Sequence, residues 1–169
     1  ANKALAWLVG NERYPTCASM LTTLNSSKCP NLTDTSIKAV AAGCTSLKDL
    51  DLAECPNLTD ESIKAVAAGC ASLKDLGVQA CRKRRVDQTS LTELVVECCS
   101  NITDESIKAV AAGCASLASL VVSWCPNLTD ESLKAVAVGC ASLTSLNVLG
   151  CGKLTDESIV AVAAGCSSL

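Results

Sequence analysis

The hydrophobic positions of this chain follow two patterns that alternate along the sequence. The first reads L-x-x-L-x-(L/V)-x-x-C, as at Leu47, Leu50, Leu52 and Cys55. Its alternation of apolar and polar residues is typical of a short strand with one buried face. The second reads TDESIKAVAAGC, in which the apolar residues recur at helical spacing and mark one buried helix face. The two patterns predict strands and helices in alternation.

Polar residues mark the ends of the predicted helices. In residues 59–70, Thr59 or Asp60 can cap the helix by accepting bonds from backbone N–H groups, and Glu61 suits the positive first turn. Gly69 is expected to end the helix in the left-handed conformation. We therefore interpret the repeated Asp and Glu of this motif as capping residues, in preference to a calcium site or an acid–base pair.

The paired patterns repeat every 26 residues, and the cysteines that follow the predicted strands mark the period. These are Cys29, Cys55, Cys81, Cys99, Cys125 and Cys151, spaced by 26 residues except for one step of 18 between Cys81 and Cys99. One repeat, at residues 82–99, is thus shortened and has no room for its helix, which should change the curvature locally. A strand–turn–helix–turn unit at fixed period predicts a right-handed α/β solenoid, with parallel strands on a concave face and helices on the convex face.

The repeated L-x-x-L-x-L-x-x-C and LTDESIKAVAAGC motifs resemble the cysteine-containing class of leucine-rich repeat. That class is common in F-box proteins, the substrate-recognition subunits of ubiquitin ligases. The resemblance covers residues 18–169 and implies a horseshoe-shaped protein-binding scaffold, such as an adaptor or a fragment of a ubiquitin-ligase substrate receptor. Residues 1–17 are too few for an F-box and are expected to form an N-terminal capping segment.

Composition narrows the chemistry. The 169 residues fit one domain, and with 49% hydrophobic but only 2% aromatic residues the core must consist of Leu, Ile, Val, Ala and Cys. The chain has no histidine, which removes Ser–His and Cys–His catalysis and every histidine-containing metal site. The net charge of −3 argues against a general nucleic-acid binder. We therefore expect a non-enzymatic protein with no cofactor, no metal, no nucleic acid and no membrane span.

The 13 cysteines are explained by the repeat. Their regular spacing, odd number and lack of a CxxC motif favour reduced thiols in a cytoplasmic or nuclear protein over disulfides or zinc. Cysteines after the strands should bond to neighbouring backbone, and those after the helices should be small core residues. Cys98 breaks the pattern. It is the candidate for a reactive thiol, and an incidental exposed cysteine is the alternative.

Residues that bind a partner should lie where the repeats differ, which is at the outward positions of the strands. The predicted partner-binding residues form an acidic patch of Asp49, Asp51, Asp75, Glu93 and Glu97, and an apolar patch of Val95, Val121 and Leu149 with Trp124 beside it. Ala53 and Ser123 occupy the third outward position of their strands. Such a face suits a protein or peptide that is basic and partly apolar. The alternative is that Trp124 covers a turn and the acids only increase solubility.

Two further features leave alternatives open. The basic loop of the shortened repeat, which consists of Arg82, Lys83, Arg84 and Arg85, is a solvated loop, a nuclear-import-like cluster, or a contact for phosphate or an acidic protein. The chain ends at Leu169, where a seventh strand would begin, so it is either a fragment of a longer array or associates end to end.

The near-identity of the repeats supports a second hypothesis about function. Even Glu61, Ser62 and Lys64, which we expect to face solvent, recur in the later repeats. A consensus-engineered or recently duplicated scaffold without an evolved ligand would show this pattern.

Overall fold

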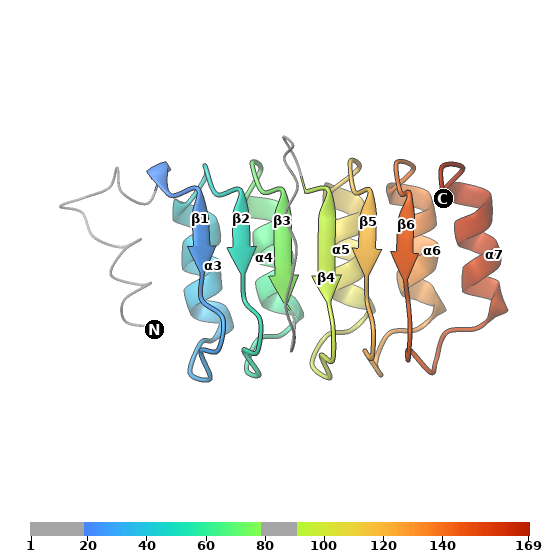
Figure 1. Cartoon of the computed structure of the whole chain (residues 1–169), viewed down its shortest axis with the longest axis horizontal. Helices are drawn as coiled ribbons and strands as arrows, with labels where there is room; N and C mark the ends of the chain where they lie inside the picture. The colour runs from blue at the N-terminus through green and yellow to red at the C-terminus, as the bar shows by residue number, and fades with distance from the viewer. Residues whose placement is uncertain (1–18, 79–90) are drawn as a thin grey trace.

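The computed structural model describes residues 19–78 and 91–169, which form a row of alternating strands and helices (Figure 1). The elements are β1 (Thr23–Asn25), α3 (Asp34–Gly43), β2 (Asp49–Asp51), α4 (Asp60–Gly69), β3 (Asp75–Val78), β4 (Glu93–Val96), α5 (Asp104–Gly113), β5 (Ser119–Val121), α6 (Asp130–Gly139), β6 (Ser145–Asn147) and α7 (Asp156–Gly165). The α/β solenoid that the repeat predicts is confirmed. The expected capping segment at 1–17 and the basic loop Arg82–Arg85 lie outside the described residues.

The six strands form one open parallel sheet in the order of the sequence, β1 to β6. Their register is constant, so that one leucine from each strand joins a single inward-facing row: Leu24, Leu50, Leu76, Leu94, Leu120 and Leu146. The described helices all cover one side of the sheet and leave the other side open (Figure 1). We call this open side the strand face. It is the face for which the sequence predicts a partner.

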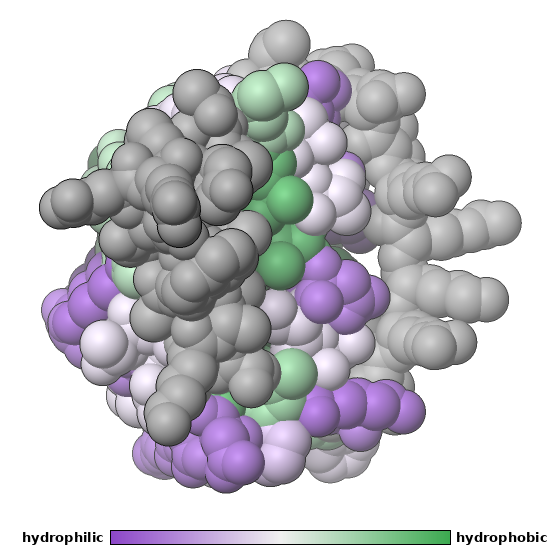
Figure 2. Space-filling model, turned by 90° about the vertical axis from the view of Figure 1, so that its left-hand side faces the viewer, coloured by the Kyte–Doolittle hydropathy of each residue, from purple (hydrophilic) through white to green (hydrophobic). Residues whose placement is uncertain are grey.

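The core lies between the sheet and the helices, and its buried apolar side chains in the described part of the chain are all aliphatic or sulfur-containing. Leu76 and Leu94 from the strands and Ile63 and Val66 from a helix are each at most 1% exposed. Figure 2, which looks along the array from the β1 end, shows apolar residues toward the middle of this end face and hydrophilic residues toward its edges. No helix in the described part of the chain is long and apolar enough to cross a membrane.

The cysteines take the two roles that the repeat predicts. After the strands, the Cys55 thiol donates to the Ser26 carbonyl at 3.2 Å, and the Cys125 thiol donates to the Val96 carbonyl at 3.4 Å. The cysteine that follows each helix is buried, as is Cys140 at 0% exposure. Every cysteine of the described residues is a free thiol.

The last glycine of α4, α6 and α7 allows close packing against the preceding helix. A Cβ added to Gly69 would lie 2.5 Å from the carbonyl oxygen of Ala41 in the preceding helix, and a Cβ on Gly139 would overlap the carbonyl of Ala111. Among the described glycines only Gly150 has a positive φ. The prediction that Gly69 ends its helix in the left-handed conformation was therefore wrong, because glycine is needed there for the approach of two backbones.

The threonine and aspartate of the TDES motif act on different helices. Thr59 caps its own helix α4, because its hydroxyl accepts a bond from the Glu61 N–H. Asp34, at the start of α3, accepts bonds from the Thr59 backbone N–H at 2.9 Å and from the Thr59 hydroxyl at 2.7 Å. Capping was thus the right interpretation for threonine only, since the aspartate links its own repeat to the next one.

This link recurs along the array. Asp130 accepts the same pair of bonds from Thr155, at 2.7 and 2.6 Å. The bond from the Thr155 hydroxyl, followed by the one from its backbone N–H, lowers the pKa of Asp130 below its ordinary value. We call the series Asp34–Thr59, Asp60–Thr103, Asp104–Thr129 and Asp130–Thr155 the aspartate ladder.

The other polar residues that recur in the helices also contact neighbours. Ser62 is fully buried and its hydroxyl donates to the Thr59 carbonyl at 2.8 Å. Lys38 of α3 pairs with Glu61 of α4 at 2.7 Å. The expectation that the repeated Glu, Ser and Lys merely face solvent was wrong for Ser62, and the charged pair connects neighbouring helices.

Candidate partner-binding face

The parallel register sorts the outward residues of the strand face into two rows. The first row is Thr23, Asp49, Asp75, Glu93, Ser119 and Ser145, and the second row is Asn25, Asp51, Gly77, Val95, Val121 and Asn147. Neighbours in a row lie one strand spacing apart, roughly 4.8 Å. The structure therefore brings together the residues that the sequence assigns to each patch, with the acids over β2–β4 and the valines over β4 and β5.

The acidic patch contains carboxylates with different partners. Asp49 accepts a bond from the Thr23 hydroxyl at 3.2 Å. Asp51 accepts one from the Asn25 amide at 3.1 Å and another from the Ala53 backbone N–H at 3.0 Å. The second of these bonds closes the turn after β2, so Asp51 has a structural role in addition to its charge. Glu93, with no such bond to the described residues, is the better residue with which to test charge alone.

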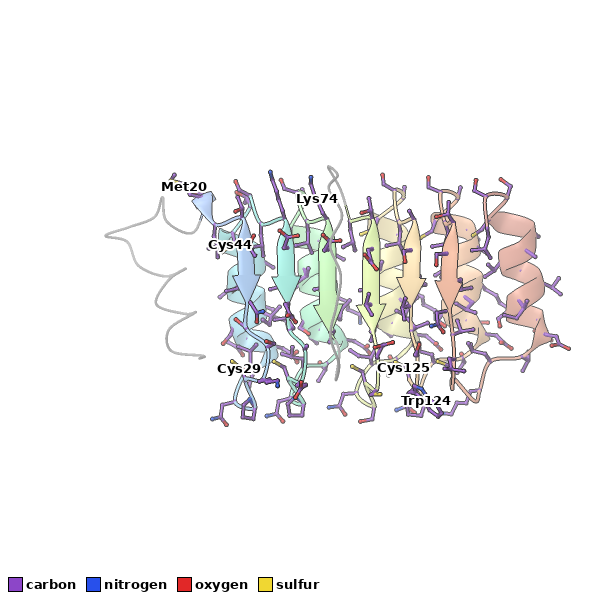
Figure 3. All side chains as sticks on the ribbon, in the orientation of Figure 1. Met20, Cys29, Cys44, Lys74, Trp124 and Cys125 are labelled. Atoms are coloured by element: carbon purple, nitrogen blue, oxygen red, sulfur yellow. The ribbon has the colours of Figure 1, made fainter. Side chains whose placement is uncertain are left out.

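Two lysines border the acidic patch and were missed by the sequence reasoning. Lys48 and Lys74 immediately precede Asp49 and Asp75, the first residues of β2 and β3. Figure 3 shows Lys74 at the edge where the strands begin. Their adjacency to the acids was a usable signal in the sequence. They place positive charge at the end of the strands where Asp49 and Asp75 lie.

The apolar patch ends at a tryptophan beside a glycine. Val95 and Val121 are paired neighbours and half-buried, whereas Leu149 and Trp124 are 62% and 58% exposed. Trp124 lies at the edge where the strands end (Figure 3), and a Cβ on Gly150 would lie 2.5 Å from its ring. The indole thus packs against the backbone of the next turn and still leaves more than half of its surface exposed.

After β2 and β5, the third outward position differs from the prediction. Ala53 and Ser123 are buried, at 7% and 3% exposure. Their carbonyls accept bonds from the Lys28 and Cys98 N–H groups, at 2.8 and 2.9 Å. The chain has already left the strand at this point and turns toward the interior. The prediction that Ala53 and Ser123 face the partner was wrong.

In every described turn that follows a strand, the residue directly before the repeat cysteine has a left-handed backbone. The φ values are 57° for Lys28, Glu54 and Cys98, 56° for Trp124 and 74° for Gly150. Positive φ is uncommon for residues other than glycine. These five residues form what we call the turn row, whose members share no side-chain chemistry, and within it Lys28 pairs with Glu54 at 3.7 Å.

The exposed thiol of the turn row should be the most reactive of the described cysteines. Burial raises the pKa of Cys125 and Cys140 to about 11 and that of Cys99 to about 12, whereas Cys98 is exposed. At pH 8 we expect iodoacetamide to modify Cys98 at least about tenfold faster than Cys125 or Cys140, because alkylation needs an accessible thiolate. Peptide mapping by mass spectrometry measures the rates. In urea the rates should converge, and similar rates in the folded chain would contradict the prediction.

Between β2 and β4 the sheet advances by two strands, whereas the helix layer advances by only one helix. In the sheet, β3 pairs with both neighbours, and the Cys99 thiol donates to the Val78 carbonyl at 3.3 Å. In the helix layer α4 lies directly beside α5, since the Thr103 N–H donates to Asp60 at 2.8 Å and Lys64 pairs with Glu105 at 3.6 Å. We call this region the junction. Most of the shortened repeat predicted at 82–99 lies outside the described residues. Its consequence, the unequal advance of sheet and helices, is visible in the described elements before and after it.

The junction explains a local change in packing. At the junction, the two strand spacings from β2 to β4 span about 9.6 Å, which is close to the 8–10 Å between packed helices. Elsewhere in the array, each pair of neighbouring helices lies over a single strand spacing. The array should therefore run straighter here than elsewhere. The helices are also less tightly packed, because a Cβ on Gly113 of α5 would lie 3.5 Å from the Ala67 carbonyl, an ordinary contact.

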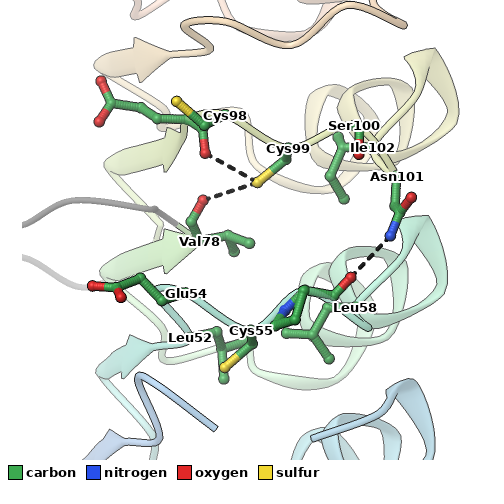
Figure 4. A pocket seen from close by; sticks show the side chains of 12 residues that line it. Leu52, Glu54, Cys55, Leu58, Val78, Cys98, Cys99, Ser100, Asn101 and Ile102 are labelled. Atoms are coloured by element: carbon green, nitrogen blue, oxygen red, sulfur yellow. Dashed lines mark hydrogen bonds between the residues drawn. The ribbon is translucent and has the colours of Figure 1, made fainter. Parts of the chain in front are cut away.

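A pocket of about 340 Å³ lies in the junction (Figure 4). Its described lining comes from Leu52, the loop of residues 54–58, the end of β3 at Val78, and the loop of residues 97–102. The sequence reasoning missed this pocket, because the pocket depends on how the two layers stack.

Comparisons with known proteins agree with this architecture. Residues 43–67, 87–111, 113–137 and 139–163 match the family described as Leucine Rich repeat. No curated protein sequence matches the chain.

Solved structures with a similar fold have low sequence identity to this chain. The yeast Rad7 and Elc1 complex contains a chain with 19% identity and a TM-score of 0.47, where the match covers 98% of this chain and 52% of that one. This chain thus spans about half the length of the yeast chain. The C-terminal domain of Caenorhabditis elegans tropomodulin has 12% identity and a TM-score of 0.57, with 98% and 90% covered. The actin-binding site 2 of leiomodin-1 has 14% identity and a TM-score of 0.56, with 98% and 87% covered.

Proposed function

Because the chain belongs to the leucine-rich-repeat family, we propose that it is a protein-binding module whose partner lies on the strand face. The family's fold is generally a non-enzymatic protein-interaction fold. One observation carries the choice of face. The helices repeat almost the same sequence, and their recurring residues contact neighbouring repeats, whereas the two rows of the strand face change from one strand to the next. A constant frame with a varied face favours recognition through the varied residues.

The charges and apolar side chains of the strand face indicate the partner's chemistry. Carboxylates gather on β2–β4, and apolar residues continue from Val95 and Val121 to Leu149 and Trp124. Partly exposed carboxylates on a binding face accelerate and orient the approach of a basic surface, and an exposed tryptophan among aliphatic residues resembles an interface hot spot. The partner we propose is a protein or peptide with a basic segment over β2–β4 and an apolar segment over β4–β6.

An adaptor role is the finer form of this proposal. The repeats resemble those of F-box proteins, in which such arrays recognise the substrates of ubiquitin ligases. A substrate receptor would hold its target on the strand face and leave the helix face free for other contacts.

Affinity capture from a cell lysate tests the choice of face. The baits are the wild-type chain, a strand-face variant with Glu93→Lys, Val121→Asp and Trp124→Asn, and a helix-face variant with Glu105→Lys and Val138→Asp. Asparagine suits Trp124's left-handed backbone, and Val138 is 89% exposed on α6. Circular dichroism confirms that all three baits are folded. We expect a partner that the wild type and the helix-face variant hold and the strand-face variant loses.

The same capture distinguishes the second hypothesis. If all three baits hold the same proteins, or none holds any, the strand face is not a binding face. The near-identical repeats would then fit a recently duplicated or engineered scaffold without an evolved ligand.

Self-association is a second candidate, favoured by the surface of α7. Val160 is 67% exposed and replaces the lysine found at this position in α3–α6. Sedimentation of the wild type and of Val160→Lys tests it. A larger species lost in the variant would support association, and a monomer at all concentrations would exclude it.

A further inference from the structure

The pocket in the junction has a geometric cause. At the level of the strand ends, the loops after β2 and β4 are two strand steps apart, because β3 lies between them. Nearer the helices the same loops meet directly, as the Asn101 amide donates to the Pro56 carbonyl at 2.9 Å. The opening therefore narrows from the strand side to the helix side, and the pocket occupies the wide part of this wedge.

The pocket has a buried apolar floor and an exposed polar rim. The floor is made of Leu52, Leu58, Val78 and Ile102, all of them buried. Pro56, Cys98, Ser100 and Asn101 on the rim are exposed. In Figure 4, Leu58 and Ile102 lie on opposite loops, while Glu54 extends away from both. A volume of about 340 Å³ lies within the usual range for ligand pockets, roughly 300–1,000 Å³.

Two carboxylates give the rim a negative charge. Among the described residues, Glu54 pairs with Lys28 at 3.7 Å and remains 43% exposed. Glu97 forms no ion pair with the described residues. Glu97 also follows Glu93 and Val95 of β4 in the alternation of outward residues, and it belongs to the acidic patch of the strand face. The pocket and the acidic patch therefore share Glu97. A chain lying on the acidic patch would thus pass beside the opening.

We propose that this pocket receives a large apolar side chain of the partner, of leucine or phenylalanine size, with basic residues beside it that pair with Glu54 and Glu97. This inference rests on the proposed function and names the feature of the partner that would fix its position. An apolar side chain buried in a central pocket and surrounded by polar contacts is the arrangement that dominates many protein interfaces. The basic neighbours follow from the rim, since a negative partner segment would bring like charges together.

Methyl NMR with short peptides tests this assignment. The full chain, carrying labelled Ile, Leu and Val methyl groups, is titrated with three acetylated and amidated tripeptides, Lys-Phe-Lys, Lys-Ser-Lys and Glu-Phe-Glu. We expect Lys-Phe-Lys to move the signals of Leu58, Val78 and Ile102 saturably. Lys-Ser-Lys should bind at least about tenfold more weakly, because it lacks the buried ring, and Glu-Phe-Glu should also bind about tenfold more weakly. Glu97→Gln should reduce the preference for lysine over glutamate, and the helix-face control Glu131→Gln should not.

Two results would overturn the assignment. Equal binding of Lys-Phe-Lys and Lys-Ser-Lys would mean that the apolar side chain does not enter the pocket. Unchanged signals of Leu58, Val78 and Ile102 with every peptide would mean that the pocket is not a binding site. The strand-face variant used for capture leaves all the pocket residues intact. The peptide result is therefore independent of the capture result, and either proposal can fail without the other.

Discussion

Replacing Gly139 with alanine is expected to lower the free energy of unfolding by about 2–3 kcal/mol. The added methyl group would overlap the carbonyl group of Ala111 in the neighbouring helix. That carbonyl belongs to the backbone of α5, so the clash can be relieved only by moving one helix away from the other. The aspartate ladder and the helix contacts between α5 and α6 would be strained by such a movement.

Gly113 provides a matched control, because it occupies the equivalent position in α5. Its added methyl group would lie 3.5 Å from the Ala67 carbonyl across the junction. Gly113→Ala should therefore be neutral or stabilise the protein by up to about 1 kcal/mol through the higher helix propensity of alanine. Urea unfolding of both variants, followed by circular dichroism, measures the difference. Equal destabilisation by the two substitutions would contradict the looser packing that we describe between α4 and α5.

Replacing Asp60 with alanine is expected to destabilise the chain by about 2 kcal/mol. Asp60 accepts bonds from both the backbone N–H and the hydroxyl of Thr103, which lies 43 residues further along the chain. These are bonds to a charged acceptor in a half-buried site. Without Asp60, the N–H that begins the α5 cap would lose its partner. The adjacent Glu61→Ala should have less than half of this effect, since its ion pair with Lys38 is exposed.

A double-mutant cycle shows whether the two residues act on each other. We expect Asp60→Ala and Thr103→Val to couple by about 1 kcal/mol or more, measured as the failure of their effects on unfolding to add. Thr129→Val serves as the control partner for Asp60→Ala, because Thr129 bonds to Asp104. No coupling with Thr103, or equal coupling with Thr129, would show that the helix layer does not step directly from α4 to α5.

The strands, the helices and the core of this fold could be predicted because each depends on residues close in sequence. The alternation around Leu50 and the helical spacing of Ile63 and Val66 specify buried faces without reference to other repeats. Adding the period was then enough to place the strands side by side, so the acidic and apolar patches of the strand face could also be located.

The errors concern residues whose role appears only when repeats stack. Gly69 resembles a helix-ending glycine, but its reason is the Ala41 carbonyl of the preceding helix. Asp60 resembles a cap for its own helix, but its bonds go to Thr103. Local sequence cannot separate these interpretations, because the decisive contact comes from another repeat.

The turn row and the pocket show a different limit. Lys28, Glu54, Cys98 and Trp124 have positive φ in common but share no side-chain property. Each directly precedes a cysteine of the repeat, so the repeat marks the position, but the residue types there do not predict a left-handed backbone. The pocket arises because the two layers step differently at the junction. A deletion is visible in the spacing of the cysteines, but the pairing of α4 with α5 that results from it is not.

Carboxyl footprinting of the captured complex tests the central claim, that the strand face is the binding face, most directly. A carbodiimide and glycine ethyl ester label exposed Asp and Glu side chains, and this chain carries them on both faces. If the partner lies on the strand face, Asp49, Asp51 and Glu93 lose label when it is bound, while Glu105 and Glu131 on the helices are labelled as in the free chain. Protection of the helix carboxylates with unchanged labelling of the strand face would contradict the claim.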